Sequence, residues 1–317
     1  MTAAAAHGGE DRPGLAIGLV LLAMLVFTCM DGLSKQLTIQ GMQPQTVTML
    51  RYFLVLAMLL PIVLMTWRSR PLHTSQPGLH ILRGVLLICS ANLFVFAVQA
   101  LPLETATAIG FVSPLFVTIL SVIFLKEHVG VRRWGAIAIG FAGVLLILRP
   151  GSSAFEAAML FPVLSSLCWA SGLIITRAMR GREKPFTVVL WTTAVGFIVI
   201  APFGLAVWQT PTLLQVGLLF LIALCHIAGQ LLTIRGYMMA SASLLAPFSY
   251  TTIIWAMLIG LLAFNSFPDL PTIAGTLVLL LAGLYVWHRE RVRTVPPTTP
   301  GASIAVVAAS AKQDDPR

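Results

Sequence analysis

The chain has 317 residues, of which 58% are hydrophobic and only 10% are charged, with a formal net charge of +9 at pH 7. A soluble domain carries about 25% charged residues, so this composition excludes a globular protein folded in water. Nucleic-acid binding is also excluded as the reason for the positive charge, because the basic residues lie in short loops between apolar runs.

Charges, glycines and prolines divide the chain into ten apolar runs, each near the roughly 20 residues that a helix needs to cross a bilayer. Backbone groups in lipid must bond within their own segment, so the runs are expected to be helices. The expected spans are 14–37, 44–67, 77–101, 103–125, 131–149, 157–179, 186–208, 212–238, 241–264 and 271–288. Residues 1–13 and 289–317 are expected to be cytoplasmic tails, the second of them disordered because it is rich in Pro, Ala, Ser and Thr.

The distribution of basic residues predicts the orientation in the membrane. The connections after the second, fourth, sixth and eighth spans, and the segment after the tenth, carry most of the loop lysines and arginines. The odd-numbered connections carry almost none, and only Arg149 borders one of them. Because basic loops stay cytoplasmic, we expect a multi-pass protein of the bacterial inner (plasma) membrane with both termini in the cytoplasm.

The two halves of the chain resemble each other weakly. An offset of 140 residues aligns Gly32 with Gly172 and Gly143 with Gly283, although the register slips in between. Each half holds five expected spans, and an odd number inverts the second half. The sequence therefore predicts an all-α integral membrane protein of ten transmembrane helices in two inverted five-helix repeats, 14–149 and 157–288. This architecture is typical of alternating-access carriers, which bind substrate between the halves.

Several local motifs point to one family. "MDGLSK" closes the first span, "LRG" (82–84) opens the third, and the long stretches 101–151 and 242–269 look like two copies of one signature. In these motifs, over about residues 14–290, the chain resembles the EamA-type transporters of the drug/metabolite transporter superfamily. It departs at Asn265 and Ser266, where the family often has Gly-Glu, while Glu127 is kept in the first copy. That loop carboxylate is therefore not expected to be essential.

The resemblance implies a secondary active transporter of a small organic metabolite, with no cofactor. Its first helix is most similar to importers of riboflavin and of S-adenosylmethionine, and exporters of amino acids or related metabolites are the alternative. A lipid-modifying membrane enzyme is a weaker reading, because the charged residues are spread over both sides of the membrane. A channel would need a continuous polar stripe or charged ring, and neither is visible in the sequence.

Three charged residues are expected to meet below the outer mouth of the bundle. Asp31 lies six residues before the end of the first span, and Arg51 lies seven residues into the second. At 1.5 Å per residue these depths are about 9 and 10 Å. Lys35 follows Asp31 by one turn on the same face, a favourable spacing. Asp31, Lys35 and Arg51 are therefore expected to form either a buried ion pair that only docks two helices, or a gate or polar wall of the substrate site. A role of Asp31 in proton coupling is a third alternative.

Other polar and aromatic residues inside the spans are candidates for substrate contact or gating. Each has packing as its alternative, or snorkelling to the headgroups in the case of Arg83. His226 and Gln230 share a helix face because they are four residues apart, and Trp169 and Tyr250 would suit an aromatic metabolite. The remaining candidates are Arg83 and Asn92.

Prolines and small residues suggest how the helices bend and pack. Pro114 and Pro247 are expected to kink the fourth and ninth spans. The glycines of the fifth and tenth spans are typical of close helix packing, as a scaffold or as the surface of a homodimer. The chain has no G-x-x-x-x-G-K-[ST] motif and no spacing of Cys or His that would hold a metal. The expected partners are a small-molecule substrate and the lipid bilayer.

Overall fold

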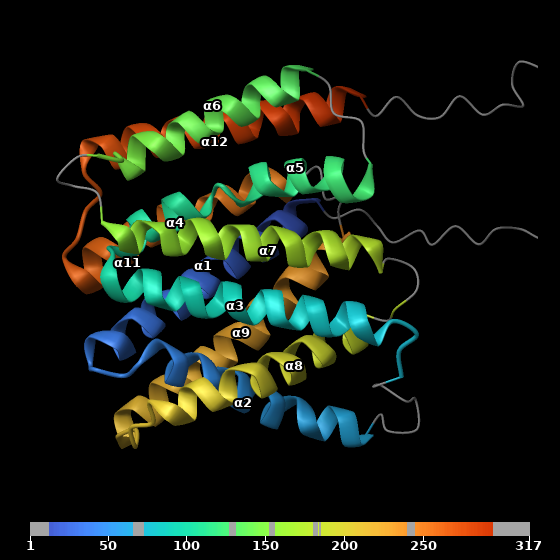
Figure 1. Ribbon diagram of the computed structural model, residues 1–317, viewed down its shortest axis with the longest axis vertical. Helices are drawn as coiled ribbons and strands as arrows, with labels where there is room; N and C mark the ends of the chain where they lie inside the picture. The colour runs from blue at the N-terminus through green and yellow to red at the C-terminus, as the bar shows by residue number, and fades with distance from the viewer. Residues whose placement is uncertain are drawn as a thin grey trace, which may run out of the picture.

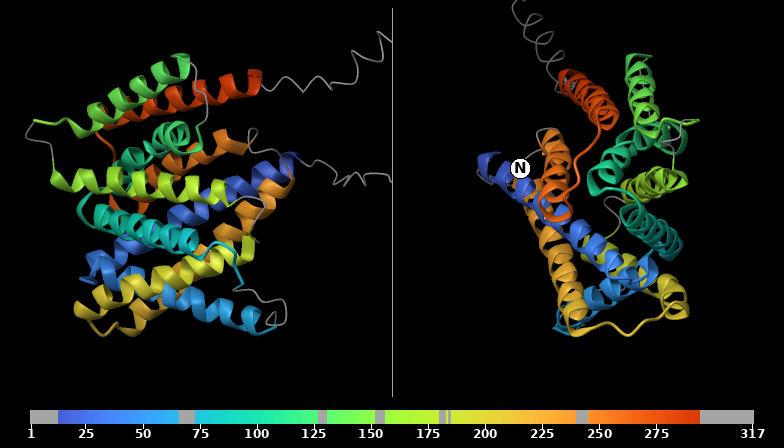
Figure 2. Two further views of the ribbon diagram at one scale, coloured as in Figure 1. Left: turned by 45° about the vertical axis from the view of Figure 1, so that its right-hand side comes forward. Right: turned by 90° about the vertical axis from the view of Figure 1, so that its left-hand side faces the viewer.

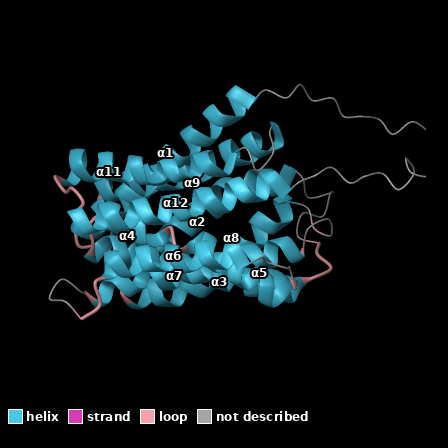
Figure 3. Cartoon of the chain, turned by 90° about the horizontal axis from the view of Figure 1, so that it is seen from above, coloured by secondary structure: helices cyan, strands magenta, loops and turns pink. Residues whose placement is uncertain are grey.

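The computed structural model describes residues 13–65, 73–126, 131–151, 156–179, 183, 185–239 and 245–293. This part of the chain is helical throughout, with loops between the helices and no strand (Figure 3). The helices are α1 (Pro13–Ile39), α2 (Pro44–Met65), α3 (Pro77–Ala100), α4 (Leu103–Gly110), α5 (Ser113–Leu125), α6 (Val131–Leu148), α7 (Leu160–Ala178), α8 (Pro185–Ala206), α9 (Leu213–Met239), α11 (Thr251–Phe264) and α12 (Leu270–Arg293), with 3-10 turns η2 (Ala157–Met159) and η3 (Ala246–Tyr250).

The described helices form a bundle of a multi-pass membrane protein. Seven segments are long and apolar enough to cross a membrane, and three shorter apolar helices accompany them at Trp134–Leu148, Phe248–Phe264 and Leu270–Tyr285. The long helices run between the two ends of the bundle, α1 and α9 obliquely to α3 and α7, and successive long helices reverse direction (Figure 1). The start of α1 and the end of α12 consequently lie at the same end of the bundle, on the right in Figure 1. We call this end the basic end and the other the opposite end.

Two expected helices differ from the sequence prediction in a related way. The span expected at 103–125 is not one helix: α4 ends at Gly110 and α5 begins at Ser113, directly before Pro114. In the second half, the 3-10 turn η3 carries Pro247 and precedes α11. Proline lacks the backbone N–H that a continuous helix needs, so both interruptions fall where the sequence carries a proline.

The last helix is longer than expected. α12 continues to Arg293, so residues 289–293 belong to a helix and not to a disordered tail. Residues 1–12 and 294–317, which hold most of the two expected tails, lie outside the described residues.

The same pairs of helices are in contact when the helices of one half are exchanged for the corresponding helices of the other. If α1, α2 and α3 are paired with α7, α8 and α9, then the packing of α1 on α9 corresponds to that of α3 on α7. The packing of α2 on α9 corresponds in the same way to that of α3 on α8, and α1 on α11 to α7 on α5. The chain thus has a two-repeat architecture. α6 and α12, which also correspond, lie side by side along one edge of the bundle in both Figure 1 and Figure 2.

The ends of two corresponding helices confirm this relationship locally. Lys126 caps α5 with a φ of 55°, and Asn265 caps α11 with a φ of 50°. Asparagine tolerates this left-handed conformation better than most residues. The replacement of the usual glycine by Asn265 therefore keeps the backbone shape that ends the helix.

Candidate functional site

A group of polar side chains lies inside the bundle where α1, α2 and α9 meet. Arg51 of α2 is 4% exposed, and the Nε of its guanidinium has no hydrogen-bond partner. It interacts electrostatically with Asp31 of α1 and with His226 of α9. The structure thus brings Asp31 and Arg51 together as expected and adds His226. We call Asp31, Arg51, Tyr52 and His226 the central cluster.

Tyr52 holds the central cluster together. Its ring centroid lies 5.4 Å from the Arg51 guanidinium carbon and 6.4 Å from the imidazole centroid of His226. On its other side the ring packs against Gly196 of α8, where a Cβ would come within 2.6 Å of a ring carbon. A larger residue at position 196 would therefore push the ring toward the cluster.

Lys35, expected beside Asp31 and Arg51, bonds elsewhere, while its role as a gating residue stays a prediction. Its ammonium donates to the carbonyl of Val98, at 2.8 Å, and to that of Leu101. These carbonyls belong to the last turn of α3 and its cap, where a helix leaves acceptors without an internal partner. The Nζ also lies 5.5 Å from the ring centroid of Phe264. Lys35 therefore fastens α1 to the ends of α3 and α11.

A buried carboxylate accompanies Lys35 at this opposite end of the bundle. Glu104, in the first turn of α4, is 1% exposed and interacts electrostatically with Lys35. Its Oε2 accepts a hydrogen bond of 3.3 Å from the hydroxyl of Ser266, which lies in the second half of the chain. A glutamate at position 266 would place a second carboxylate beside Glu104, and like charges at this distance repel each other. The departure of Ser266 from the usual glutamate is therefore consistent with the position of Glu104.

Arg83 of α3 lies where α3, α7 and α8 meet. These helices correspond to α9, α1 and α2, so this junction is the counterpart of the central cluster in the other half. Its Nε donates to the Thr176 hydroxyl of α7 at 2.7 Å, and another guanidinium nitrogen donates to the Thr192 hydroxyl of α8. The Thr192 hydroxyl in turn donates to the carbonyl of Val188. These bonds mark Arg83 as a link between three helices rather than a side chain snorkelling to the headgroups.

Trp169 lies beside Arg83. Both residues line a small hollow between α3 and α7, together with Leu87, Gly172, Leu173 and Thr176. The indole is about half exposed. The hollow has a volume of only about 30 Å³, so in this conformation it holds no more than small molecules such as water.

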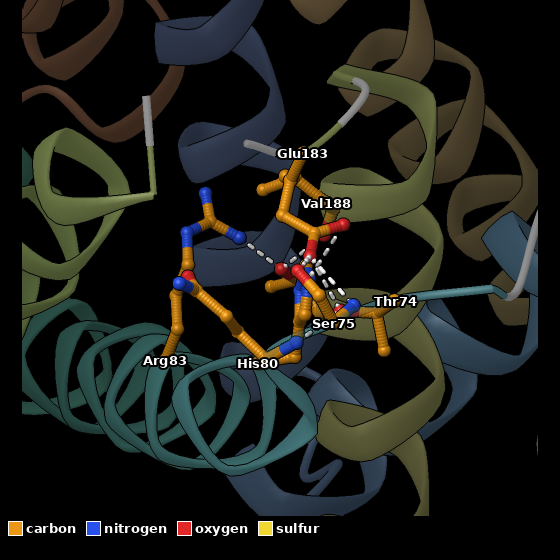
Figure 4. A network of polar contacts seen from close by, with 8 residues as sticks. Thr74, Ser75, His80, Arg83, Glu183 and Val188 are labelled. Carbon is orange, nitrogen blue, oxygen red and sulfur yellow. Dashed lines mark hydrogen bonds and ion pairs between the residues drawn. The ribbon is translucent and has the colours of Figure 1, made fainter. Parts of the chain in front are cut away.

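A second network joins the two halves near the basic end (Figure 4). The Oε1 atom of Glu183, between α7 and α8, accepts hydrogen bonds from the Thr74 hydroxyl at 2.7 Å and from the Ser75 backbone N–H at 3.0 Å. Its Oε2 lies 3.6 Å from Nε2 of His80, which is fully buried and stacks on Trp191. The hydrogen bond from Thr74, followed by those from Ser75, lowers the pKa of the Glu183 carboxyl below its usual range. We call these residues the Glu183 network.

The structure places the remaining candidates as follows. Asn92 lies on α3 between Ile88, which packs with Tyr52, and Val95, which packs with Met30. Its buried Oδ1 has no hydrogen-bond partner, so an unused acceptor lies on the α3 face that covers the central cluster.

Gln230 lies one turn after His226 on α9 and is half-buried. Tyr250 packs its ring 5.3 Å from that of Phe111, and its hydroxyl lies against Gly283 of α12. Among the described residues, the contacts of Tyr250 are thus at the interruption between α4 and α5 and not at the central cluster.

Sequence reasoning missed four of the residues described above: Tyr52, His80, Glu104 and Glu183. Glu104 carried a usable signal, because it is the only charged residue in the run 103–125, and intramembrane charges usually mark function. Glu183 is the one acidic residue in an otherwise basic loop. Among the described residues there is no group of three His, Cys, Asp or Glu side chains that could hold a metal ion.

Comparisons with known proteins agree with this architecture. The sequence signature of the EamA-like transporter family matches residues 14–149 and 156–287. The chain is 30% identical over 277 residues to an S-adenosylmethionine uptake transporter of Rickettsia bellii, covering 87% of this chain and 94% of that protein. It is 29% identical over 283 residues to a riboflavin transporter of Vibrio cholerae, covering 86% and 94%. A solved crystal structure matches 90% of this chain and all of its own with a TM-score of 0.57 at 15% identity, which shows a common fold.

Proposed function

The chain belongs to the EamA-like transporter family, and on that premise we propose that it is a secondary active carrier that moves a small organic metabolite by alternating access. The family and the relatives are transporters and not enzymes. The observation that carries the proposal is the central cluster. Charged side chains inside a membrane bundle are costly and are kept where they contact a substrate or an ion, and Arg51 is both buried and short of partners.

The proposed topology has ten membrane crossings in two inverted halves. The seven long apolar segments and the three shorter ones supply these crossings. Corresponding helices of the halves, such as α1 and α7, run in opposite directions (Figure 1). Lys126, Arg235 and the arginines that end α12 belong to the basic end, and basic loops stay cytoplasmic. The basic end would then face the cytoplasm of a bacterial cell, with both termini on that side.

Alternating access needs a closure on each side of the substrate site. Toward the opposite end, Lys35 and Glu104 of the first half meet Ser266 and Phe264 of the second. Toward the basic end, Thr74 and Ser75 meet Glu183. The closure toward the basic end consists of polar contacts, whereas the one toward the opposite end also packs Phe264 and Ile259 of the second half on the core of the first. Opening one closure while the other stays shut would expose the central cluster to one side only.

The substrate that we propose is S-adenosylmethionine, taken up into the cell, because a relative that matches most of the chain carries that name. Riboflavin is the second candidate. It is favoured by the similar identity to a riboflavin transporter.

Uptake by purified protein in liposomes tests the proposal. With labelled S-adenosylmethionine outside, we expect saturable uptake that excess unlabelled compound abolishes and that empty liposomes lack. Saturable uptake of riboflavin alone would move the assignment to the second candidate. Non-saturable leakage of both compounds would contradict a carrier mechanism.

A further inference from the structure

Asp31 and Arg51 carry opposite charges on neighbouring helices, yet they do not pair directly. Arg51 interacts electrostatically with Asp31, but among the described residues neither side chain forms an ion pair or a hydrogen bond with another. Arg51 is 4% exposed and its Nε has no hydrogen-bond partner. The two groups thus interact electrostatically without forming an ion pair, and the buried Nε of Arg51 keeps a donor that no described residue uses.

Leaving the Arg51 guanidinium buried with a donor unpaired, next to the half-buried carboxyl of Asp31, is unfavourable. A ligand that carries one positive and one negative group a short distance apart would satisfy both at once. A single anion would satisfy only Arg51, and a single cation only Asp31. The arrangement therefore selects for a zwitterion.

The other buried cations near this region are already in use. Arg83 donates to Thr176 and Thr192, and Lys35 donates to the carbonyls of Val98 and Leu101. Arg51 is consequently the guanidinium with free donors, held in place by the ring of Tyr52 at 5.4 Å. The partnerless Oδ1 of Asn92, on the α3 face that covers the cluster, adds a second acceptor to the Asp31 carboxylate.

We infer that the central cluster binds the head group of an α-amino acid, with the ligand's carboxylate on Arg51 and its ammonium on Asp31 and Asn92. This inference rests on the proposed carrier function and names the part of the substrate that is recognised. S-adenosylmethionine carries such a head group, whereas riboflavin has neither a carboxylate nor an ammonium. The central cluster therefore favours the first of the two candidate substrates.

Binding to the wild-type full-length protein in detergent tests the inference without any substitution. The probes are S-adenosylmethionine, S-adenosylhomocysteine, decarboxylated S-adenosylmethionine, which lacks only the carboxylate, and methylthioadenosine, which lacks the whole amino-acid head. We expect the first two to bind with similar affinity. We expect decarboxylated S-adenosylmethionine to bind at least tenfold more weakly, and methylthioadenosine more weakly still. Equal affinity for S-adenosylmethionine and its decarboxylated form would overturn the inference.

Substitutions then test which protein residue binds the carboxylate of the ligand and which binds its ammonium. Arg51→Gln should remove the difference between S-adenosylmethionine and its decarboxylated form while leaving the affinity for methylthioadenosine within twofold. Asp31→Asn should weaken all three of the ammonium-bearing ligands and leave methylthioadenosine unchanged. Arg235→Gln, at an exposed position of α9, is the matched control and should change none of these affinities. If Arg51→Gln weakens methylthioadenosine as much as S-adenosylmethionine, Arg51 has a structural role and the inference fails.

Two outcomes separate this inference from the proposed substrate. If the adenosyl compounds do not bind but a free α-amino acid does, with the same dependence on Arg51, the inference holds and the assignment of S-adenosylmethionine fails. If only riboflavin binds, and Arg51→Gln leaves its affinity unchanged, the inference fails while a carrier function stands.

Discussion

Gly143 of α6 and Gly275 of α12 approach each other so closely that neither has room for a side chain. A Cβ on Gly143 would lie 2.9 Å from the carbonyl oxygen of Gly275, and a Cβ on Gly275 would lie 2.6 Å from that of Gly143. The two residues belong to the corresponding helices α6 and α12, which pack side by side. In a membrane, where the solvent is as apolar as the side chains, such close backbone packing is what holds helices together.

Gly275→Ala should therefore loosen the packing of α12 on α6. The added methyl group meets a backbone oxygen, which cannot rotate away as a side chain can, so the helices must move apart. Overpacking of this kind costs about 1–3 kcal/mol. We expect that loss in the free energy of unfolding, measured by SDS titration of the protein in mixed micelles.

Gly135→Ala is the control for this prediction. Gly135 lies in the same helix α6, but nothing lies within 4 Å of the position its Cβ would take. Alanine is the better helix former by about 1 kcal/mol, so this variant should be as stable as the wild type or slightly more so. Equal stability of Gly275→Ala and Gly135→Ala would show that the contact between the two glycines does not hold the helices together.

The buried pair of Lys35 and Glu104 gives a second prediction. Lys35→Met removes the donors to Val98 and Leu101 and leaves Glu104 without its cation. Breaking a buried pair from one side costs about 3–5 kcal/mol. We expect a loss of that order in the free energy of unfolding, and a partial recovery when Glu104→Gln is added, because the second change removes the unpaired charge.

A double-mutant cycle measures this coupling directly. The losses of Lys35→Met and Glu104→Gln should sum to more than the loss of the double variant. Arg235→Gln, which changes an exposed cation on α9, should alter the stability by less than about 0.5 kcal/mol. Strict additivity of the two single losses would mean that Lys35 and Glu104 act independently.

The sequence predicts the helices well and the pairing of their side chains poorly. Apolar runs of spanning length identify most of the helices, because lipid leaves the backbone no other partner than itself. The face of a helix can also be predicted, as for Asp31 and Arg51, whose depths match. The direction of a long side chain cannot. Lys35 lies one turn from Asp31, but its flexible stem reaches carbonyls of α3, and no local spacing reveals which helix lies within its reach.

The two closures are hidden from the sequence for the same reason. Glu183 and Thr74 are far apart in the chain and belong to loops of ordinary polar composition. Their contact exists because α3 and α8 pack together, which depends on the whole fold. The interruption before Pro114 lies between these cases: the proline predicts a bend, but only the structure gives two separate helices.

The Glu183 network predicts a dependence of stability on pH. The Thr74 and Ser75 donors hold the pKa of the folded Glu183 carboxyl below the value of about 4.3 that glutamate has when unfolded. A lowered pKa in the folded state stabilises the protein above the unfolded pKa, and this contribution is lost as the pH falls through the folded pKa. Glu183→Gln should therefore lower the unfolding temperature at pH 7, by about 2 °C for each kcal/mol lost, and the difference from the wild type should shrink below about pH 4.3.

Thermal unfolding followed by tryptophan fluorescence between pH 7 and pH 3.5 measures this difference. Glu156→Gln is a suitable control, since Glu156 is an exposed loop residue and its loss should shift the unfolding temperature little at any pH. A difference between wild type and Glu183→Gln that stays constant down to pH 3.5 would show that the carboxylate charge is not what the network stabilises.

The inverted arrangement of the halves predicts opposite labelling of two corresponding positions. Gln40 follows α1 and Ala178 ends α7, and both residues are exposed. In a chain whose native cysteines 29, 89, 168 and 225 are replaced, an impermeant maleimide should label Gln40→Cys in intact cells. It should label Ala178→Cys only after the membrane is made permeable, because α1 and α7 run in opposite directions (Figure 1).

Two exposed loop positions serve as controls. Gln209→Cys, at the opposite end, should be labelled like Gln40→Cys, and His73→Cys, at the basic end, should be labelled like Ala178→Cys. Labelling of Gln40→Cys and Ala178→Cys from the same side would place the halves parallel in the membrane and exclude alternating access by exchange of their two conformations.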